Sequence, residues 1–298
     1  MVKRLETQLK NASQIKGVLK QVPVSWKLKG RRVETLLVYL PTKDGVTDHQ
    51  GFFELIREGI LHNFVFSCKE IERKLGIENP NAVENLFNKA VRKLSRHTAQ
   101  GELGELILFT LLDVYFNAPK LLSKVSMKTT PKVPVFGGDS VHGQFDGSGF
   151  KLYLGESKMH KTFSSASSDA IPSIQSAKQR YYVEFDLLDS FMDFPNIDAD
   201  FESKLIDLLD PFSSDDVSEF IHSPCFIGFN APALISDAKT EKEFIEAYKE
   251  QAKKMVGSYF TRAEKKGIEI DDTALMILPF SSIDDLVDGF IAHMGITQ

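Results

Sequence analysis

Apolar runs and helical periodicity divide the first third of the chain into a strand and two helices. The apolar, β-rich run at 33–41 predicts a strand, because a proline and a turn-prone Lys-Asp-Gly sequence close it. Residues 52–75 and 82–116 repeat their apolar positions with the helical period, so each predicts a helix. Gly101 and Gly104 fall inside the second helix and are candidate interruptions, since glycine costs about 1 kcal/mol relative to alanine there.

The rest of the chain alternates strands with helices. Segments 123–130, 139–146 and 150–158 predict three strands, the last two joined by a Gly-Ser-Gly turn as a β-hairpin. The elements expected after the hairpin are a serine-rich loop at 164–168, a helix at 169–188, a strand at 225–235, a helix at 241–266, a strand at 274–280 and a helix capped by Ser282. This order predicts an α/β fold with a mixed sheet.

Composition favours an intracellular protein with one large domain or two small ones. A chain of 298 residues that is 42% hydrophobic can bury a full core. The basic N-terminus is not followed by an apolar segment, so we expect no signal peptide, and the apolar run at 106–112 is too short to span a bilayer. Cys68 and Cys225 fit no metal or redox spacing, which indicates a reducing, cytoplasmic setting.

Charge is distributed unevenly along the chain. Residues 1–35 carry nine lysines and arginines against two acids, whereas residues 184–220 carry twelve acids against one lysine. Each segment is either a solvated surface or a contact, the basic one for phosphates or an acidic partner and the acidic one for a basic partner. With a net charge of −5, we expect weak DNA binding by the isolated chain, because non-specific affinity depends on cationic contacts to phosphates.

The predicted hairpin brings two acids and a lysine together. Glu156 and Lys158 are two residues apart on one strand, so they emerge on the same face. If residues 147 and 148 form a two-residue turn, Asp139 lies directly opposite Glu156, with β-carbons roughly 5 Å apart. A bulge or a three-residue turn would change this register.

Two opposed carboxylates repel each other, and a divalent cation removes that repulsion. Mg²⁺ or Mn²⁺ suits such hard oxygen ligands and typically takes one or two protein carboxylates with water and substrate phosphate oxygens. A lysine beside the metal can orient the attacking water or stabilise charge on the phosphate. The three residues Asp139, Glu156 and Lys158 therefore predict a phosphodiester-cleaving site.

A third acid is expected from the helix before the hairpin. Glu102 and Glu105 are both candidates, since their spacing places them on one face. We favour Glu105, because it falls within the apolar periodicity and should face the core. His142 and His160 flank the acids and make a zinc site a weaker alternative, which no cysteine or His-x-x-x-His spacing supports.

Four strings carry a family resemblance, namely GELGELILFTLL, GGDSVHG, YLGESKMH and ILPFSSIDDL. The order of a glutamate-bearing helix, a strand opening with Asp139 and a strand ending in Glu-Ser-Lys resembles the PD-(D/E)XK nuclease superfamily. The longer strings resemble the HamA family, the nuclease subunits of the Hachiman anti-phage defence system, over residues 95–298. The proline that names the superfamily is replaced by Gly138.

The resemblance implies a restriction-endonuclease-like mixed sheet flanked by helices, in a nuclease-like domain that we expect at 81–298. Before it we expect an N-terminal α+β extension at 1–80 that makes partner or DNA contacts. It implies that Asp139, Glu156 and Glu105 bind the metal and that Lys158 is the catalytic lysine. It also implies DNA as substrate and a HamB-type helicase partner that restrains the nuclease until foreign or damaged DNA engages it. The chain lacks the Gly-rich Lys-Ser/Thr phosphate loop of ATPases, so any ATP would be used by a partner.

Two other functions compete with this interpretation. One is a non-catalytic, nuclease-like module that docks a helicase and senses DNA. The other is a repair or restriction nuclease, whose products would have defined ends.

Overall fold

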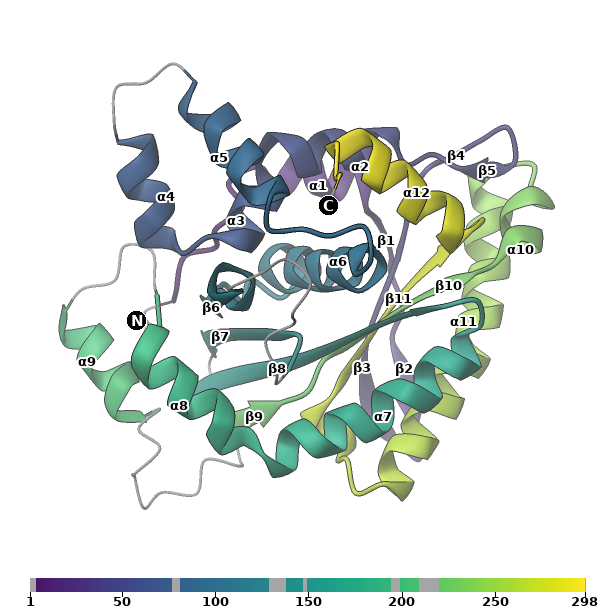
Figure 1. The fold of residues 1–298 in the computed structure, drawn as a ribbon. Helices are drawn as coiled ribbons and strands as arrows, with labels where there is room; N and C mark the ends of the chain where they lie inside the picture. Colours follow the sequence, from purple (N-terminus) through teal and green to yellow (C-terminus); the bar gives the residue numbers. More distant parts are fainter. Residues whose placement is uncertain are drawn as a thin grey trace.

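The computed structural model describes residues 4–76, 81–128, 138–146, 149–193, 199–208 and 220–297. Its centre is a mixed sheet in which nine strands can be followed among these residues, ordered β1-β3-β11-β10-β8-β7-β6, with β2 beside β3 and β9 beside β8 (Figure 1). The strands of this sheet are β1 (Lys20–Val22), β2 (Trp26–Leu28), β3 (Arg31–Tyr39), β6 (Lys120–Leu122), β7 (Ser140–Asp146), β8 (Gly149–His160), β9 (Ile221–His222), β10 (Cys225–Asn230) and β11 (Ala274–Phe280). The fold is α/β, as the sequence predicted.

Four parallel strands form the middle of the sheet. β3, β11, β10 and β8 run in the same direction, and β7 turns back antiparallel to β8. β11 is buried along its whole length, which is typical of a strand covered on both faces. Because β3 comes from the N-terminal extension, the first 80 residues complete the same sheet that carries the hairpin. β4 (Thr42–Lys43) and β5 (Val46–Thr47) form a separate small hairpin.

Helices cover both faces of the sheet (Figure 1). The helices are α1 (Ala12–Val18), α2 (Gln50–Leu55), the π-helical turn η1 (Ile56–Ile60), α3 (Leu61–Val65), α4 (Cys68–Leu75), α5 (Ala82–Val91), α6 (Ala99–Tyr115), α7 (Phe163–Gln179), α8 (Tyr181–Phe191), α9 (Ala199–Leu208), α10 (Pro232–Ser236), α11 (Glu241–Lys265) and α12 (Ile283–Met294), with 3-10 turns η2 (Lys124–Met127) and η4 (Ile270–Asp272). α6 packs in the apolar core on one face, together with α2, α3, α5 and α12, and α7 and α11 pack in the core on the other.

The two N-terminal helices were predicted to be longer than they are. The helix expected at 52–75 is interrupted at Ser67, whose hydroxyl accepts a hydrogen bond from the Glu70 amide and so begins α4. The helix expected at 82–116 breaks at 92–98, where the Ser95 amide binds the Glu102 carboxylate. The interruption expected at Gly101 and Gly104 is wrong, because both lie inside α6.

The strand expected at 123–130 is also wrong where it is described. Residues 124–127 form the 3-10 turn η2, because the side chains of Lys124 and Lys128 turn inward to buried carboxylates instead of alternating across a sheet. The third strand of this region is β6, directly before it. Residues 129–130 and the turn residues 147–148 lie outside the described part of the chain.

Most of the remaining elements follow the predictions with shifted ends, but the single helix expected at 169–188 is wrong, because the chain breaks at Arg180 into α7 and α8. β3, β7, β8, β11, α11 and α12 are found where they were expected, and the Ser282 hydroxyl caps α12. α7 begins at Phe163 rather than after the serine-rich segment, because Thr162 accepts a hydrogen bond from the Ser165 amide and caps the helix. β10 ends at Asn230, and Pro232 opens α10.

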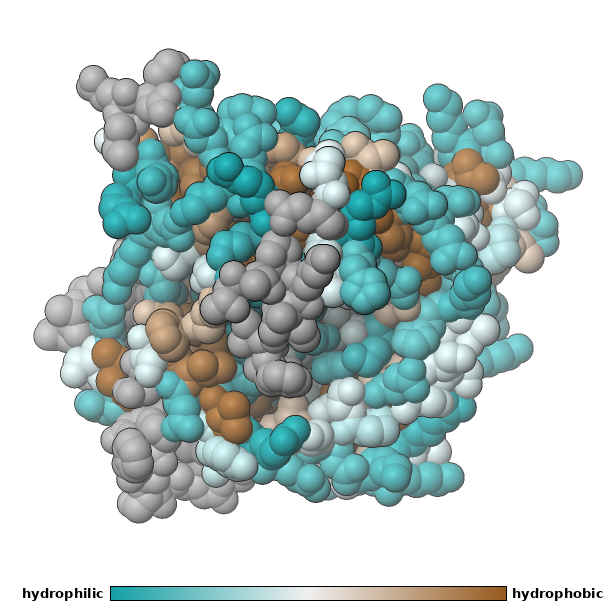
Figure 2. Space-filling model, viewed as in Figure 1, coloured by the Kyte–Doolittle hydropathy of each residue, from teal (hydrophilic) through white to brown (hydrophobic). Residues whose placement is uncertain are grey.

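The surface in view is mostly hydrophilic, with small apolar areas (Figure 2). Exposed large apolar side chains are scattered, and the most exposed is Phe191 at the end of α8, with 57% of its surface accessible. Among the described residues, no helix combines the length and apolar character needed to cross a membrane.

Candidate active site

The hairpin has the register that the sequence predicted. Its pairs run from Ser140 opposite Gly155 to Asp146 opposite Gly149, so continuing one residue outward places Asp139 opposite Glu156. The Asp139 amide donates a hydrogen bond to the Gly155 carbonyl at 2.9 Å, which fixes Asp139 directly before the first residue of β7.

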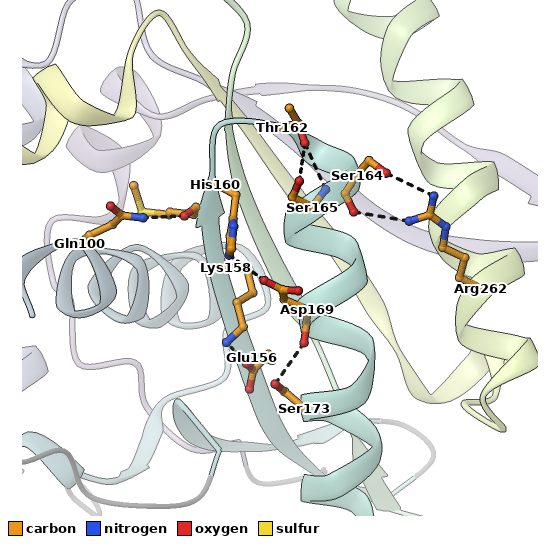
Figure 3. Close-up of polar contacts among 11 residues, drawn as sticks. Gln100, Glu156, Lys158, His160, Thr162, Ser164, Ser165, Asp169, Ser173 and Arg262 are labelled. Atoms are coloured by element: carbon orange, nitrogen blue, oxygen red, sulfur yellow. Dashed lines mark hydrogen bonds and ion pairs between the residues drawn. The ribbon is translucent and has the colours of Figure 1, made fainter.

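Glu156 and Lys158 lie on the face of β8 that is turned towards α7 (Figure 3). Strand alternation places them on one side, and their side chains form an ion pair. Ser157, between them, points to the opposite face, where a β-carbon on Gly104 of α6 would lie only 3.3 Å from its hydroxyl. Glycine at 104 therefore lets α6 approach β8 closely.

Asp139 is held in place by backbone and side-chain contacts. One oxygen of its carboxylate accepts hydrogen bonds from the Ser157 amide at 2.7 Å and the Ser157 hydroxyl at 3.0 Å. The preceding residue, Gly138, donates to Glu184 of α8 and accepts from Lys124, both at 2.7 Å. Lys124 and Glu184 also form a buried ion pair, so the chain is clamped where it enters the site.

The two glutamates of α6 differ in their contacts. Glu102 is buried and satisfied, with Lys128 at 2.7 Å, the Thr98 hydroxyl at 2.8 Å and the Ser95 amide at 3.1 Å. Glu105 has no hydrogen-bond or ion-pair partner within the described part of the chain. It lines a cavity of about 230 Å³ together with Asp139, as Glu102 also does. Glu105 is therefore the α6 carboxylate that is available for chemistry.

Burial and mutual repulsion shift the pKa values of the acids. Burial raises the pKa of Glu105 to about 8, and the negative charge of Asp139 adds to this shift. Burial raises the pKa of Glu156 to about 7, and Asp139 again adds to it, while the Lys158 ammonium opposes it. Burial lowers the pKa of Lys158, but the Glu156 carboxylate outweighs this effect and the net shift is upward.

Asp139 connects acids that come from two faces of the sheet. Its charge acts on Glu105, which comes from α6, and on Glu156, which faces α7. The structure thus places the other three predicted residues, Glu105, Glu156 and Lys158, where the charge of Asp139 acts on each of them. No group of three or more His, Cys, Asp or Glu residues that could hold a metal ion is found in the described ranges. Carboxylates such as those of Asp139 and Glu156 are chemically suited to Mg²⁺, because this ion commonly takes one or two protein carboxylates and completes its shell with water.

The HamA family matches residues 19–294. The chain belongs to the HamA family. This membership supports a role in anti-phage defence. A search of curated proteins found no match.

Several contacts of this HamA-family site were not foreseen from sequence. Ser157 binds Asp139, and Lys124 and Lys128 pair with Glu184 and Glu102. The inward lysines had a weak signal in the alternating segment at 123–130, but alternation alone predicted a strand. Glu184 gave no signal, because it is one acid among twelve in its segment.

The two histidines that made zinc an alternative are engaged elsewhere. His142 is fully buried beside Phe109, its Nδ1 lies 2.7 Å from the Ala118 carbonyl oxygen, and burial lowers its pKa to about 3. His160 lies 3.3 Å from Asp169 of α7 (Figure 3). Both therefore have local partners.

Proposed function

We propose that the chain is a metal-dependent DNA endonuclease of an anti-phage defence system that acts with a partner helicase. The observation that carries this proposal is that two buried carboxylates, Glu105 and Glu156, and one lysine, Lys158, lie within the electrostatic influence of Asp139. The raised pKa values of Glu105 and Glu156 show that these acids are held in a setting that disfavours their charge. Perturbed carboxylates gathered in this way are typical of catalytic sites.

Each residue has a distinct role in this proposal. Asp139 and Glu156 would hold Mg²⁺ or Mn²⁺, and Glu105, which lines the same cavity as Asp139, would add a further acid from α6. When bound, the metal polarises the phosphoryl group and lowers the pKa of a coordinated water. Lys158 donates hydrogen bonds to the attacking water or to the phosphate oxygen that gains charge, and its ion pair with Glu156 keeps the ammonium beside the reacting atoms.

The overall charge supports a role for a partner in DNA delivery. The chain has a net charge of −5, so it offers few cationic contacts for holding DNA by itself. A helicase partner supplies DNA binding and ATP hydrolysis and, by family resemblance, restrains cleavage until foreign or damaged DNA is engaged. We expect the isolated chain to bind DNA weakly at physiological salt and the complex to bind it tightly.

The test is degradation of plasmid DNA by the purified chain, with and without its helicase, in Mg²⁺, Mn²⁺ or EDTA. We expect cleavage only with metal and a loss of at least about 100-fold in the Lys158→Ala variant, as for removal of one charge-stabilising donor elsewhere. Lys253→Ala on the exposed side of α11 is the matched control and should cleave normally.

The folded state of each variant is checked by circular dichroism, so that lost activity is not lost structure. If the helicase complex leaves DNA intact in both metals although both subunits are folded and associated, the chain is a docking and sensing module rather than a nuclease. Products with defined ends would instead favour a restriction-type enzyme.

A further inference from the structure

A second cavity, of about 650 Å³, lies at the opposite end of α6 from the candidate active site. β10 and β11 begin only at Cys225 and Ala274, which are paired with Glu156 and Glu34. The first residues of β3 and β8 extend beyond those starts, and beside β8 only the two-residue strand β9 continues the sheet, paired with Leu152 and Tyr153, so the sheet is open next to β3. Tyr115 and Phe116 at the end of α6 line the same opening. Its volume is within the usual range for a small-molecule site.

The walls of this cavity collect cations from the basic N-terminal segment. Arg4, Lys16 and Arg32 line it, and none of the three has a carboxylate partner among the described residues. In contrast, Lys20, Lys29 and Arg31 of the same segment pair with acids on or beside α11 and η4. Three cations of the basic segment are thus paired outside the cavity, whereas the three that line it have no carboxylate partner in the described ranges.

The cavity also contains two acids and one further lysine. Lys151 of β8 adds a fourth cation to the lining, while Glu34 and Asp271 contribute negative charge. Asp271 is paired with Arg31 at 2.5 Å, so part of that charge is compensated. Four cations against two acids favour an anionic ligand.

Aromatic rings line the same space. Phe116 and Tyr153 meet edge to face with centroids 6.1 Å apart, and Phe145 of β7 lines the cavity as well. Lys16 lies 5.4 Å from the centre of the Tyr115 ring, so a cation and an aromatic surface are adjacent. Cations that bind phosphate beside rings that stack on bases are the usual combination for nucleotides and single strands.

We propose that this cavity binds a nucleotide, either free or at the end of a nucleic-acid strand. Arg4, Lys16 and Arg32 bind the phosphate, and the base lies against the ring of Phe116 or Phe145. Ten residues of α6 separate Glu105 from Tyr115, which places the cavity about 15 Å from the α6 carboxylate of the active site. The site is distinct from the catalytic one, and the proposal holds whether or not the chain cleaves DNA.

The test is equilibrium binding to the full chain in EDTA, so that no metal-dependent cleavage occurs. The probes are deoxyadenosine 5′-monophosphate, a 5′-phosphorylated ten-residue oligothymidylate and ribose 5-phosphate. We expect at least one of the first two to bind and ribose 5-phosphate to bind at least fivefold more weakly, because it lacks a base. Binding of the mononucleotide identifies a free nucleotide as ligand, and binding of the oligonucleotide alone identifies a strand end.

Three variants complete the test. The double variant Lys16→Gln, Arg32→Gln should weaken binding at least tenfold, and Phe116→Leu, which keeps an apolar side chain, at least threefold. The matched control, Lys253→Gln with Lys254→Gln on α11, removes the same charge elsewhere and should bind normally. The proposal is overturned if neither nucleotide probe binds at millimolar concentration, or if the α11 control weakens binding as much as the cavity variant.

Discussion

Two groups of buried charges lie side by side in the hairpin region, and they differ in how many lysines accompany their acids. In the first group each acid has its own lysine, since Lys124 pairs with Glu184 and Lys128 pairs with Glu102, all four at most 9% exposed. In the second group, around Asp139, Glu156 pairs with Lys158, whereas Glu105 has no cation in contact within the described residues and only the more distant charges of Lys128 and Lys124 oppose its pKa shift.

This difference indicates that the first group stabilises the fold and that the second group is suited to chemistry. The balanced pairs fix the segments that carry Gly138 and the start of α6, and every carboxylate there has a cation in contact. The unbalanced group raises the pKa values of two acids, because burial and repulsion act without enough positive charge. A fold keeps such a conflict mainly where function requires it. A bound cation from outside would restore the balance.

Breaking a balanced pair should have the largest effect on stability. Lys128→Met leaves the Glu102 carboxylate buried without its cation, so we expect the free energy of unfolding to fall by about 3–5 kcal/mol. The measurement is urea unfolding at pH 7. Adding Glu102→Gln should recover much of the loss, since no uncompensated charge then remains.

An exposed ion pair provides the control for that experiment. Lys10 and Glu6 are 70% and 56% exposed, so Lys10→Met should change the free energy of unfolding by less than about 1 kcal/mol. If Lys128→Met is equally mild, the buried pairs are not structural and the contrast between the two groups fails.

Much of the geometry around Asp139 could be predicted from the sequence. Strand alternation and the 17-residue separation of Asp139 from Glu156 were enough to predict the hairpin register, because a two-residue turn leaves little freedom. Glu105 was preferred over Glu102 for its apolar neighbours. The structure supports that preference for a different reason, namely that Glu102 is occupied by Lys128.

The sheet pairing and the buried ion pairs that hold the fold together could not be predicted from the sequence. The pairing of β3 with β11 joins residues more than 200 positions apart, and no local pattern records it. The buried pairs likewise depend on where α8 and η2 meet, which tertiary packing decides. Lys124 and Lys128 therefore looked like strand residues until their distant carboxylate partners were known.

Replacing Glu105, a buried acid with no cation in contact within the described residues, should stabilise the metal-free protein. The pKa of Glu105 is raised to about 8 in the folded state from an ordinary value near 4.5, so folding disfavours its ionised form. Below pH 4.5 both states are protonated and the acid has no effect. Between pH 4.5 and 8 the unfolded state loses its proton first, so stability falls as pH rises. Glu105→Gln removes this loss and should stabilise the protein at pH 8 by about 1–3 kcal/mol.

The measurement is thermal and urea unfolding in EDTA at pH 4.5 and pH 8. We expect no gain at pH 4.5 and the full gain at pH 8. Adding Mn²⁺ should stabilise the wild type more than the variant, because the variant lacks one carboxylate near the ion. A variant that is no more stable than wild type at pH 8 would show that Glu105 is not under electrostatic stress.

The smallest expected effect concerns Ser157, whose hydroxyl contacts Asp139. Ser157→Ala removes that hydrogen bond but keeps the one from the backbone amide, so Asp139 should stay in place with less restraint. One neutral hydrogen bond contributes about 0.5–1.5 kcal/mol, so we expect the Mn²⁺ concentration for half-maximal cleavage to rise about twofold to tenfold, with little change in rate at saturating metal. Ser168→Ala on α7, which loses the hydroxyl that accepts a hydrogen bond from Arg262 of α11, is the control and should leave both values unchanged. A fall in the saturated rate without a change in metal dependence would mean that Ser157 acts on the reacting groups rather than by positioning Asp139, and that the acids around Asp139 do not share one ion.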